Sequence, residues 1–209
     1  MLLVLGTKNL NKIREITAIL SDLPDVQFLT FHERPFSDVL EDGRTFEENA
    51  RKKAQEICAQ TGLPVLAEDS GLEVYALGGA PGVRSARFAG SSKDDRANIE
   101  KLLDALRGVS DRRARFRCVA VLALPTGEEV VSEGVLEGRI SPAPAGTLGF
   151  GYDPVFIPDG YEHTLAELGP QIKNRISHRR RALEGLKARL QSALSEPHLE
   201  KKEQGRQEG

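Results

Sequence analysis

The chain has 209 residues, of which 39% are hydrophobic and 29% charged, and its net charge is −2. This size and composition are typical of one globular domain with a full core, and the near-neutral charge argues against a protein that coats a nucleic-acid polymer. The longest apolar run, Cys118–Leu124, is too short to span a membrane, and residues 1–6 lack the length and basic flank of a signal peptide.

Strands and helices are predicted in alternation along the first half of the chain. Short apolar runs are typical of strands, and apolar residues that recur at helical spacing are typical of amphipathic helices. Asn9 or Asn11 can cap the first helix, and Thr45, with Glu48 three residues later, makes a capping-box signature for the second. The expected elements are a strand at Leu2–Leu5, a helix ending near Asp22, a strand at Val26–Phe31, a helix to Thr61 and a strand at Pro64–Ala67.

An antiparallel hairpin is predicted in the second half, where Thr126-Gly127 separates two strand patterns. The elements expected there are a helix at Asp94–Leu106, strands at Arg113–Leu124, Glu128–Leu136 and Pro154–Ile157, and a last helix that Ser177 can cap. Strands that alternate with helices, followed by a hairpin, predict an α/β protein with a mixed sheet. We expect one domain over residues 1–195 and a disordered polar tail over 196–209. Cys58 and Cys118 lie in no metal-ligand spacing, so we expect reduced thiols in a cytoplasmic protein.

The most informative segment is Pro144–Phe156. It combines three glycines with two aromatic residues and an acid: Gly146, Gly149, Gly151, Phe150, Tyr152 and Asp153. Glycine lets the backbone approach a ligand closely, an aromatic ring stacks on a nucleobase, and a carboxylate accepts a hydrogen bond from a base N–H. The segment therefore favours recognition of a flat heterocycle, with a glycine-rich turn whose rings cap the core as the alternative.

An anion-binding turn is predicted between the first strand and the first helix, at Thr7–Lys12. Backbone N–H groups at a helix N-terminus attract anions. Lys12 lies in the first turn, where its charge opposes the helix dipole unless a phosphate is present. The glycine pattern of a Walker A loop is missing, and an ordinary polar turn is the alternative.

Adjacent acids follow a buried strand at Glu68-Asp69. Buried carboxylates are costly unless they are paired or bind a metal, and Mg²⁺ takes one or two carboxylates together with substrate phosphates. The alternative is an exposed acidic turn.

Two basic segments complete the candidate site. Lys52 and Lys53 follow an acidic loop that contains Glu41, although this segment taken alone favours ion pairs on an ordinary solvated helix face. The segment Lys173–Arg181 places basic side chains at a capped helix start, where they can hold a phosphate or donate to a base carbonyl, with a solvent-facing basic helix as the alternative. Together these segments supply what a nucleoside triphosphate with Mg²⁺ requires.

Six ordered motifs carry a family resemblance from Leu3 to about Leu183. They are T-K-N-L-N-K (7–12), T-F-E-E-N-A (45–50), A-E-D-S-G-L (67–72), G-G-A-P-G-V-R-S-A-R (78–87), G-F-G-Y-D-P-V-F (149–156) and K-N-R-I-S-H-R (173–179). On these motifs the chain resembles the inosine triphosphate pyrophosphatase family. The resemblance implies a two-lobed α/β structure around a long mixed β-sheet with flanking helices, a nucleotide cleft between the lobes, and a homodimer. It also implies Mg²⁺-dependent cleavage of ITP, dITP and XTP at the α–β phosphoanhydride to the monophosphate and pyrophosphate, which cleanses the nucleotide pool.

The resemblance also implies site residues by position. Asp69 looks like a metal ligand and the base that activates water, with Glu41 and Glu68 assisting the metal, and Lys12 and Lys53 look like catalytic phosphate contacts. The implied substrate-binding set is Thr7, Lys8, Asn9, Leu10, Asn11, Lys12, Ser70, Phe150, Gly151, Tyr152, Asp153, Lys173, His178 and Arg179. Leu40 stands where the family frequently has an acid, so the second protein ligand of the metal stays open.

Two other functions stay possible on the sequence alone. One is a Maf-like pyrophosphatase acting on pyrimidine or modified nucleotides, against which the G-F-G-Y-D-P and S-H-R segments argue. The other is a catalytically silent nucleotide sensor. The enzyme interpretation requires that Asp69 share one cavity with Phe150 and His178. We expect that a structure with Asp69 on the opposite face from these two residues would exclude this interpretation.

Overall fold

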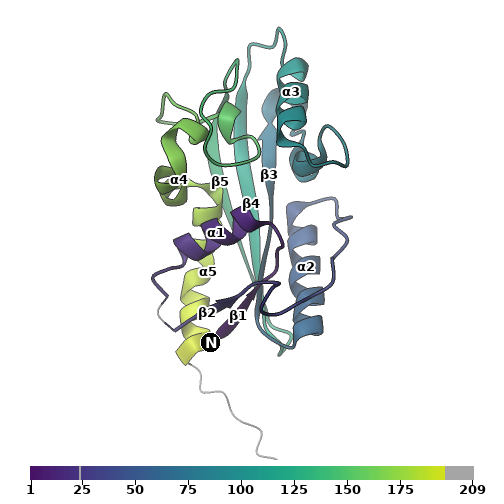
Figure 1. Cartoon of the computed structure of the whole chain (residues 1–209), viewed down its shortest axis with the longest axis vertical. Helices are drawn as coiled ribbons and strands as arrows, with labels where there is room; N and C mark the ends of the chain where they lie inside the picture. Colours follow the sequence, from purple (N-terminus) through teal and green to yellow (C-terminus); the bar gives the residue numbers. More distant parts are fainter. Residues whose placement is uncertain (24, 196–209) are drawn as a thin grey trace, which may run out of the picture.

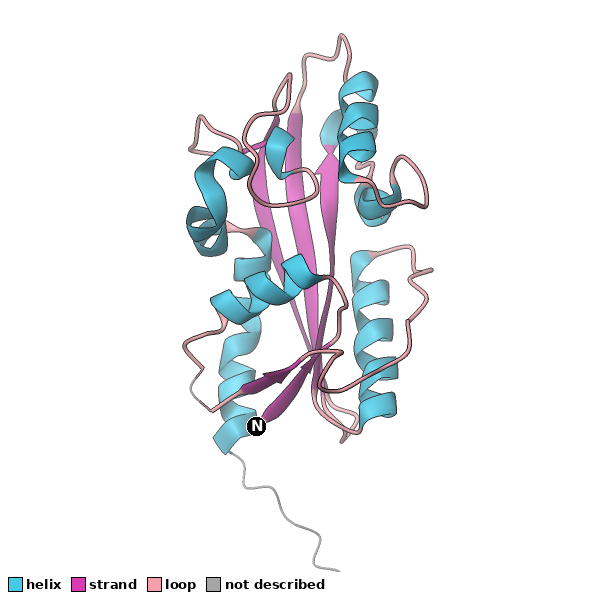
Figure 2. Cartoon of the chain, in the orientation of Figure 1, coloured by secondary structure: helices cyan, strands magenta, loops and turns pink. Residues whose placement is uncertain are grey.

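A six-stranded mixed sheet in the order β2-β1-β3-β4-β5-β6 forms the centre of the computed structural model (Figures 1 and 2), which describes residues 1–23 and 25–195. The strands are β1 (Leu2–Leu5), β2 (Gln27–Leu29), β3 (Val65–Val74), β4 (Arg113–Ala123), β5 (Glu129–Ile140) and β6 (Phe156–Pro158). β1 pairs in parallel with β2 and β3, and the other pairs are antiparallel. This is the predicted mixed α/β sheet with flanking helices. The predicted tail, residues 196–209, lies outside the described residues.

Helices cover both ends of the long strands β3, β4 and β5 (Figure 1). They are α1 (Leu10–Ile19), α2 (Phe46–Thr61), α3 (Asp95–Ala105), α4 (Leu165–Ile176) and α5 (His178–Ser195), with 3₁₀ turns η1 (Tyr75–Leu77), η2 (Gly82–Arg87) and η3 (Asp153–Val155). At the end of the sheet that carries β1 and β2, one apolar core lies against α1 and α5 and another against α2. A third core joins α3 and α4 to the other end of the sheet. The molecule therefore has two lobes joined by three continuous strands.

The strand β3 differs from the prediction in a way that shapes the site. The sequence predicted a strand that ends at Ala67, but β3 runs unbroken to Val74, because β4 pairs with it along its whole length. On its other side β1 pairs only with Val65 and Leu66. Between Ala67 and Leu72 that edge of β3 meets no other strand in the described part of the chain. Since side chains alternate along a strand, Glu68 and Asp69 project from opposite faces of the sheet.

The helix α4 was not predicted from the sequence. Gly169 has a left-handed backbone (φ 78°) and precedes Pro170 inside the helix, so the helical pattern is interrupted. Thr164 and Glu167 form a complete capping box at its start, and this was the signal that could have located it. The predicted cap of α5 is confirmed, because Ser177 Oγ accepts a hydrogen bond from Arg180 N at 3.1 Å.

Other predictions can be checked directly. Cys58 and Cys118 are both buried and free. Thr45 caps α2 as expected, but Glu48 accepts from Arg44 N instead of closing the capping box on Thr45 N. Within the described ranges, no helix has the length and apolar character needed to cross a bilayer.

Candidate active site

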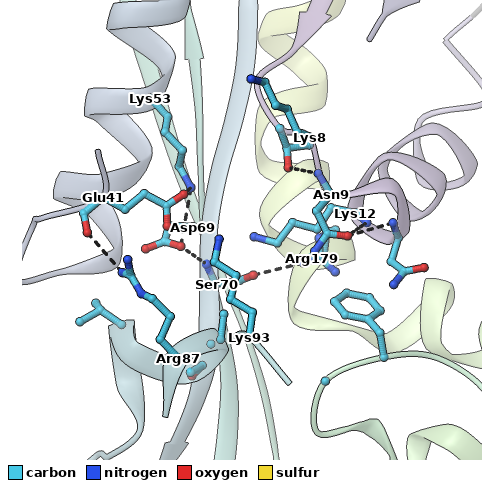
Figure 3. Close-up of a pocket in the computed structure, with 18 of the residues that line it drawn as sticks. Lys8, Asn9, Lys12, Glu41, Lys53, Asp69, Ser70, Arg87, Lys93 and Arg179 are labelled. Atoms are coloured by element: carbon cyan, nitrogen blue, oxygen red, sulfur yellow. Dashed lines mark hydrogen bonds and ion pairs between the residues drawn. The ribbon is translucent and has the colours of Figure 1, made fainter. Parts of the chain in front are cut away.

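One cavity of about 730 Å³ opens between the lobes at the free edge of β3 (Figure 3). Of the residues predicted for the site, those in its lining are Thr7, Lys8, Asn9, Asn11, Lys12, Glu41, Lys53, Asp69, Ser70, Phe150, Gly151, Tyr152, Asp153, Lys173, His178 and Arg179. Leu10 and Glu68 are not in the lining. The volume suits a drug-sized or nucleotide-sized ligand. Segments far apart in the sequence thus meet in one place.

The required common cavity is present, although its geometry differs from the expectation. Asp69 projects toward α2, whereas His178 stacks on Phe116, on the opposite face of the sheet, with ring centroids 4.8 Å apart. The expectation that opposite faces exclude a shared site was wrong. The cavity passes around the unpaired edge of β3 and reaches both faces, so Asp69, Phe150 and His178 all line it.

Two carboxylates and one ammonium meet beside α2. Lys53 Nζ lies 2.9 Å from Glu41 Oε1 and 3.7 Å from Asp69 Oδ1. Asn49 Nδ2 donates to Asp69 Oδ2 at 3.0 Å, and Ser70 N donates to Asp69 Oδ1 at 3.0 Å. Lys53 and Asp69 are buried, so the exposed acidic turn and the wholly solvated helix face are both wrong.

Burial sets the protonation behaviour of this acidic pair. It raises the pKa of Asp69, and the charge of Glu41 adds to this, while Lys53 and Lys12 act against it. Burial also raises the pKa of Glu41, but its ion pair with Lys53 and the charges of Lys12 and Lys93 outweigh burial and lower that pKa. The pair therefore combines an ionised Glu41 with an Asp69 that accepts a proton more readily than an exposed aspartate.

Glu68 faces away from this pair and holds cations. Glu68 is 1% exposed, and its carboxylate lies 3.0 Å from Lys12 Nζ and 3.1 Å from Arg179 Nη2. Burial raises the pKa of Glu68, but Arg179 and Lys12 hold it well below its usual range. Figure 3 shows Glu41, Lys53 and Asp69 on one side of the strand and Lys12 and Arg179 on the other. Glu68 is therefore not part of the acidic pair. Its carboxylate instead holds Lys12 and Arg179 in position.

Glu15 is a site residue that sequence reasoning missed. From the second turn of α1 it pairs with Lys173 Nζ at 2.8 Å and with Arg179 Nη1. Burial raises its pKa, but these two cations outweigh burial and lower it. Its position three residues after Lys12, on the same face of the helix, was the available signal. Arg87 and Lys93 also line the cavity and were missed.

The turn before α1 is held by its own side chains. Asn9 caps the helix, with Oδ1 accepting from Asn11 N at 2.9 Å and from Lys12 N at 3.2 Å. Lys8 pairs with Asp38 at 2.7 Å at the rim of the cavity. Leu10 is 52% exposed and is not part of the cavity lining, so its predicted contact with substrate finds no support here and stays a prediction. The helix N-terminus at the cavity is suited to an anion.

Both rings of the glycine-rich loop belong to the cavity lining, but they differ in burial. Phe150 is half-buried, and Lys173 Nζ lies 4.3 Å from its ring centroid. Tyr152 is 4% exposed, and its hydroxyl donates to Ser85 O at 2.9 Å, so its ring belongs mainly to the core. Asp153 Oδ2 accepts from Lys173 Nζ at 2.5 Å and from Phe150 N at 2.9 Å. Asp153 thus fixes the loop and Lys173, and Phe150 is the ring available for stacking.

His178 and Arg179 begin α5 and are buried, so the solvent-facing basic helix is wrong. Burial and the charges of Arg179 and Lys173 hold the pKa of His178 well below its usual range, which makes the imidazole neutral. Its buried Nδ1 has no hydrogen-bond partner within the described structure. Arg179 donates to Glu68, Glu15 and Ser70, so most of its N–H groups are engaged inside the protein.

The cavity combines cations, a carboxylate pair and an aromatic ring on a mixed α/β sheet. These features define a class of protein that binds a small anionic molecule with a flat ring. The chain belongs to the Ham1 family, whose model matches residues 3–189. This confirms the family resemblance.

Named relatives cover nearly the whole chain. A dITP/XTP pyrophosphatase of Geobacter sulfurreducens is 50% identical over 191 residues, which are 90% of this chain and 96% of the relative. The dITP/XTP pyrophosphatase of Syntrophobacter fumaroxidans is 49% identical over 198 residues, or 94% of this chain and 85% of the relative. The solved structure of a HAM1 protein from Coxiella burnetii is 44% identical with a TM-score of 0.84, covering 92% of this chain and 99% of that one.

Proposed function

We propose that this protein is a nucleoside-triphosphate pyrophosphatase that hydrolyses noncanonical purine nucleotides, dITP, XTP and ITP, at the α–β phosphoanhydride. The products are the monophosphate and pyrophosphate, and the role is to cleanse the nucleotide pool. One observation carries the proposal: the carboxylate pair, the anion-binding helix start and the Phe150 loop line a single cavity. Relatives named dITP/XTP pyrophosphatase, about half identical over most of the chain, support the choice of substrate.

Magnesium fits the donor set beside α2. Glu41 and Asp69 offer hard carboxylate oxygens near one shared ammonium, and Mg²⁺ binds through one or two carboxylates while substrate phosphates and water complete its coordination. In the described ranges, no three His, Cys, Asp or Glu side chains cluster into an all-protein metal cage. We propose that Glu41 and Asp69 hold Mg²⁺, which when bound supplies charge neutralisation at the phosphates.

The protein's own residues would position the substrate and the attacking water and compensate the charge of the phosphates. Lys12 and Lys53 reach the cavity from opposite sides of β3 and would neutralise the triphosphate and the departing pyrophosphate. We propose that Asp69 orients the attacking water and takes its proton, a role that the pKa raised by burial supports. Asn49 and Ser70 N hold its carboxylate in place.

Selectivity for 6-oxo purines follows from donors beside the ring. Hypoxanthine and xanthine present a carbonyl acceptor at C6, where adenine presents an amino donor. His178, neutral and with a free ring nitrogen, and the unengaged N–H of Arg179 would donate to that carbonyl. With adenine these donors would stay buried and unpaired, which costs about 1–3 kcal/mol for each group. A site built to hydrogen-bond one group discriminates strongly against its replacement.

One assay tests the proposal against both alternatives. The purified protein is incubated with Mg²⁺ and ITP, dITP, XTP, GTP, ATP, dTTP or UTP, and the products are identified by chromatography. We expect IMP, dIMP or XMP together with pyrophosphate. Preference for pyrimidine nucleotides would favour a Maf-like enzyme, binding without turnover would favour a sensor, and orthophosphate with a nucleoside diphosphate would contradict the proposal. Asp69→Asn should lower turnover by roughly 10²–10⁴-fold without unfolding the protein.

The remaining expectations from the family resemblance stay proposals. We propose a homodimer, which sedimentation velocity would test directly, and a cytoplasmic location, which fractionation of the source cells would test. Omission of Mg²⁺ from the assay, followed by its return, tests the metal requirement. The near-neutral net charge supports a small-molecule substrate and no nucleic-acid polymer.

A further inference from the structure

Lys93 is a cavity-lining residue whose role none of the motifs explains. It lies in the loop between η2 and α3, in the lobe opposite the loop that carries Asp38 and Glu41. Figure 3 shows it together with Arg87 among the side chains around the cavity. Its long cationic side chain lines the same cavity as Glu41, Lys53 and Asp69.

Among the described residues, the ammonium group of Lys93 has no hydrogen-bond or ion-pair partner, whereas the other lysines and arginines of the cavity lining have one. The other lysines and arginines in the lining are Lys8, Lys12, Lys53, Arg87, Lys173 and Arg179, and each has a hydrogen bond or ion pair with an oxygen of the protein. Lys93 alone among the described lining cations has none. A free ammonium can bind an incoming anion without first breaking a bond inside the protein.

The backbone at Lys93 also has an uncommon conformation. Its φ of 53° lies in the left-handed region, and it is the one non-glycine residue with positive φ among the residues described. Such conformations are uncommon outside glycine and cluster at ligand-binding sites. Its charge reaches the opposite loop, where it adds to the hydrogen bond and charge of Lys8 in lowering the pKa of Asp38.

We infer that Lys93 binds the two terminal phosphates of the substrate, which leave as pyrophosphate. This inference rests on the proposed function, because it assigns the distal end of the same cavity. The ring end is occupied by Phe150 and His178, so the nucleotide's polyphosphate must extend toward Glu41 and Lys53. Lys93 then discriminates a triphosphate from a monophosphate, whose single phosphate ends short of this position.

The test compares the affinities for inorganic pyrophosphate and for IMP, measured by calorimetry with Mg²⁺ present. Lys93→Gln should weaken pyrophosphate binding about fivefold, as expected for one partly exposed ion pair, and should leave IMP binding unchanged. Lys93→Arg keeps the charge and should restore the affinity. Lys101→Gln is the matched control, because Lys101 belongs to the same lobe, lies outside the cavity lining and loses the same charge.

A second variant separates charge from backbone strain. Lys93→Gly suits the left-handed backbone and removes the ammonium, so it should fold and lose pyrophosphate affinity as Lys93→Gln does. Unchanged pyrophosphate affinity in both variants, or an equal loss in Lys101→Gln, would overturn the inference. If the wild-type protein hydrolyses no nucleotide but still binds pyrophosphate through Lys93, then the proposed function fails and this anion site remains.

Discussion

Asn49 connects the loop that carries Glu41 to the strand that carries Asp69. Its Nδ2 donates to Asp69 Oδ2 at 3.0 Å, while its Oδ1 accepts from Gly43 N at 2.8 Å. Asn49 is 1% exposed, and a Cβ at Gly43 would lie only 2.6 Å from Asn49 Oδ1. One buried amide thus sets the spacing of the two carboxylates.

Replacement of Asn49 by leucine should damage both stability and activity. Asn49→Leu keeps the branched shape but leaves Gly43 N–H and the Asp69 carboxylate without their buried partner, which costs about 1–3 kcal/mol of unfolding free energy. Urea unfolding measures that loss. Turnover of dITP should fall and more Mg²⁺ should be needed for half-maximal rate, because Glu41 and Asp69 lose their spacing. A variant that is less stable but has normal turnover and metal requirement would restrict Asn49 to a structural role.

Glu15 should govern recognition of the base and not of the phosphates. It pairs with Lys173 and Arg179, both buried beside Phe150. Glu15→Gln leaves two buried cations short of a charged partner, which typically costs about 3–5 kcal/mol. We expect a higher KM for dITP and unchanged affinity for inorganic pyrophosphate. Glu100→Gln, which breaks the exposed pair with Arg96, should change stability by less than about 0.5 kcal/mol. Equal weakening of dITP and pyrophosphate binding would contradict this role.

Gly149 should tolerate no side chain. Its φ is 82°, and a Cβ there would lie 2.1 Å from Asp153 Oδ2, the atom that holds both Phe150 N and Lys173. Gly127 has a similar φ of 89° but nothing within 4 Å of the same position, so Gly127→Ala reports backbone strain alone. Gly149→Ala should therefore lose dITP affinity and more stability than Gly127→Ala, as thermal unfolding and KM would show. Equal effects in the two variants would mean that the contact with Asp153 is unimportant.

His178 should make the protein less stable as the pH falls below about 6.5. Burial, Arg179 and Lys173 hold its folded-state pKa well below that of the unfolded chain. The unfolded state therefore binds the proton first, and stability present above pH 6.5 is lost by about 1.4 kcal/mol for each unit below it. Guanidinium unfolding at pH 7.5 and 5.5 measures the difference, and His178→Phe should remove this part of it. An identical pH dependence in the variant would show that the pKa of His178 is the same in the folded and unfolded states.

The sequence by itself determined the elements whose residues carry local signals. The apolar runs, the caps at Asn9, Thr45 and Ser177, and the turn at Thr126-Gly127 each depend on neighbours in the chain, so the pattern was sufficient. The motifs likewise identified most of the cavity lining, because segments that follow strands in α/β proteins meet at one place.

Only the tertiary structure decided which partners the charged groups take. Sequence placed Glu68 and Asp69 side by side at the end of a strand, but pairing with β4 extends β3 and sends the two carboxylates to opposite faces of the sheet. The roles of Glu15 and Lys93 depend on their positions relative to segments that are far away in the sequence. A local sequence pattern carries no information about such segments. A charge pattern reports residue types and spacing, whereas the field and burial at each group arise from chain segments brought together by folding.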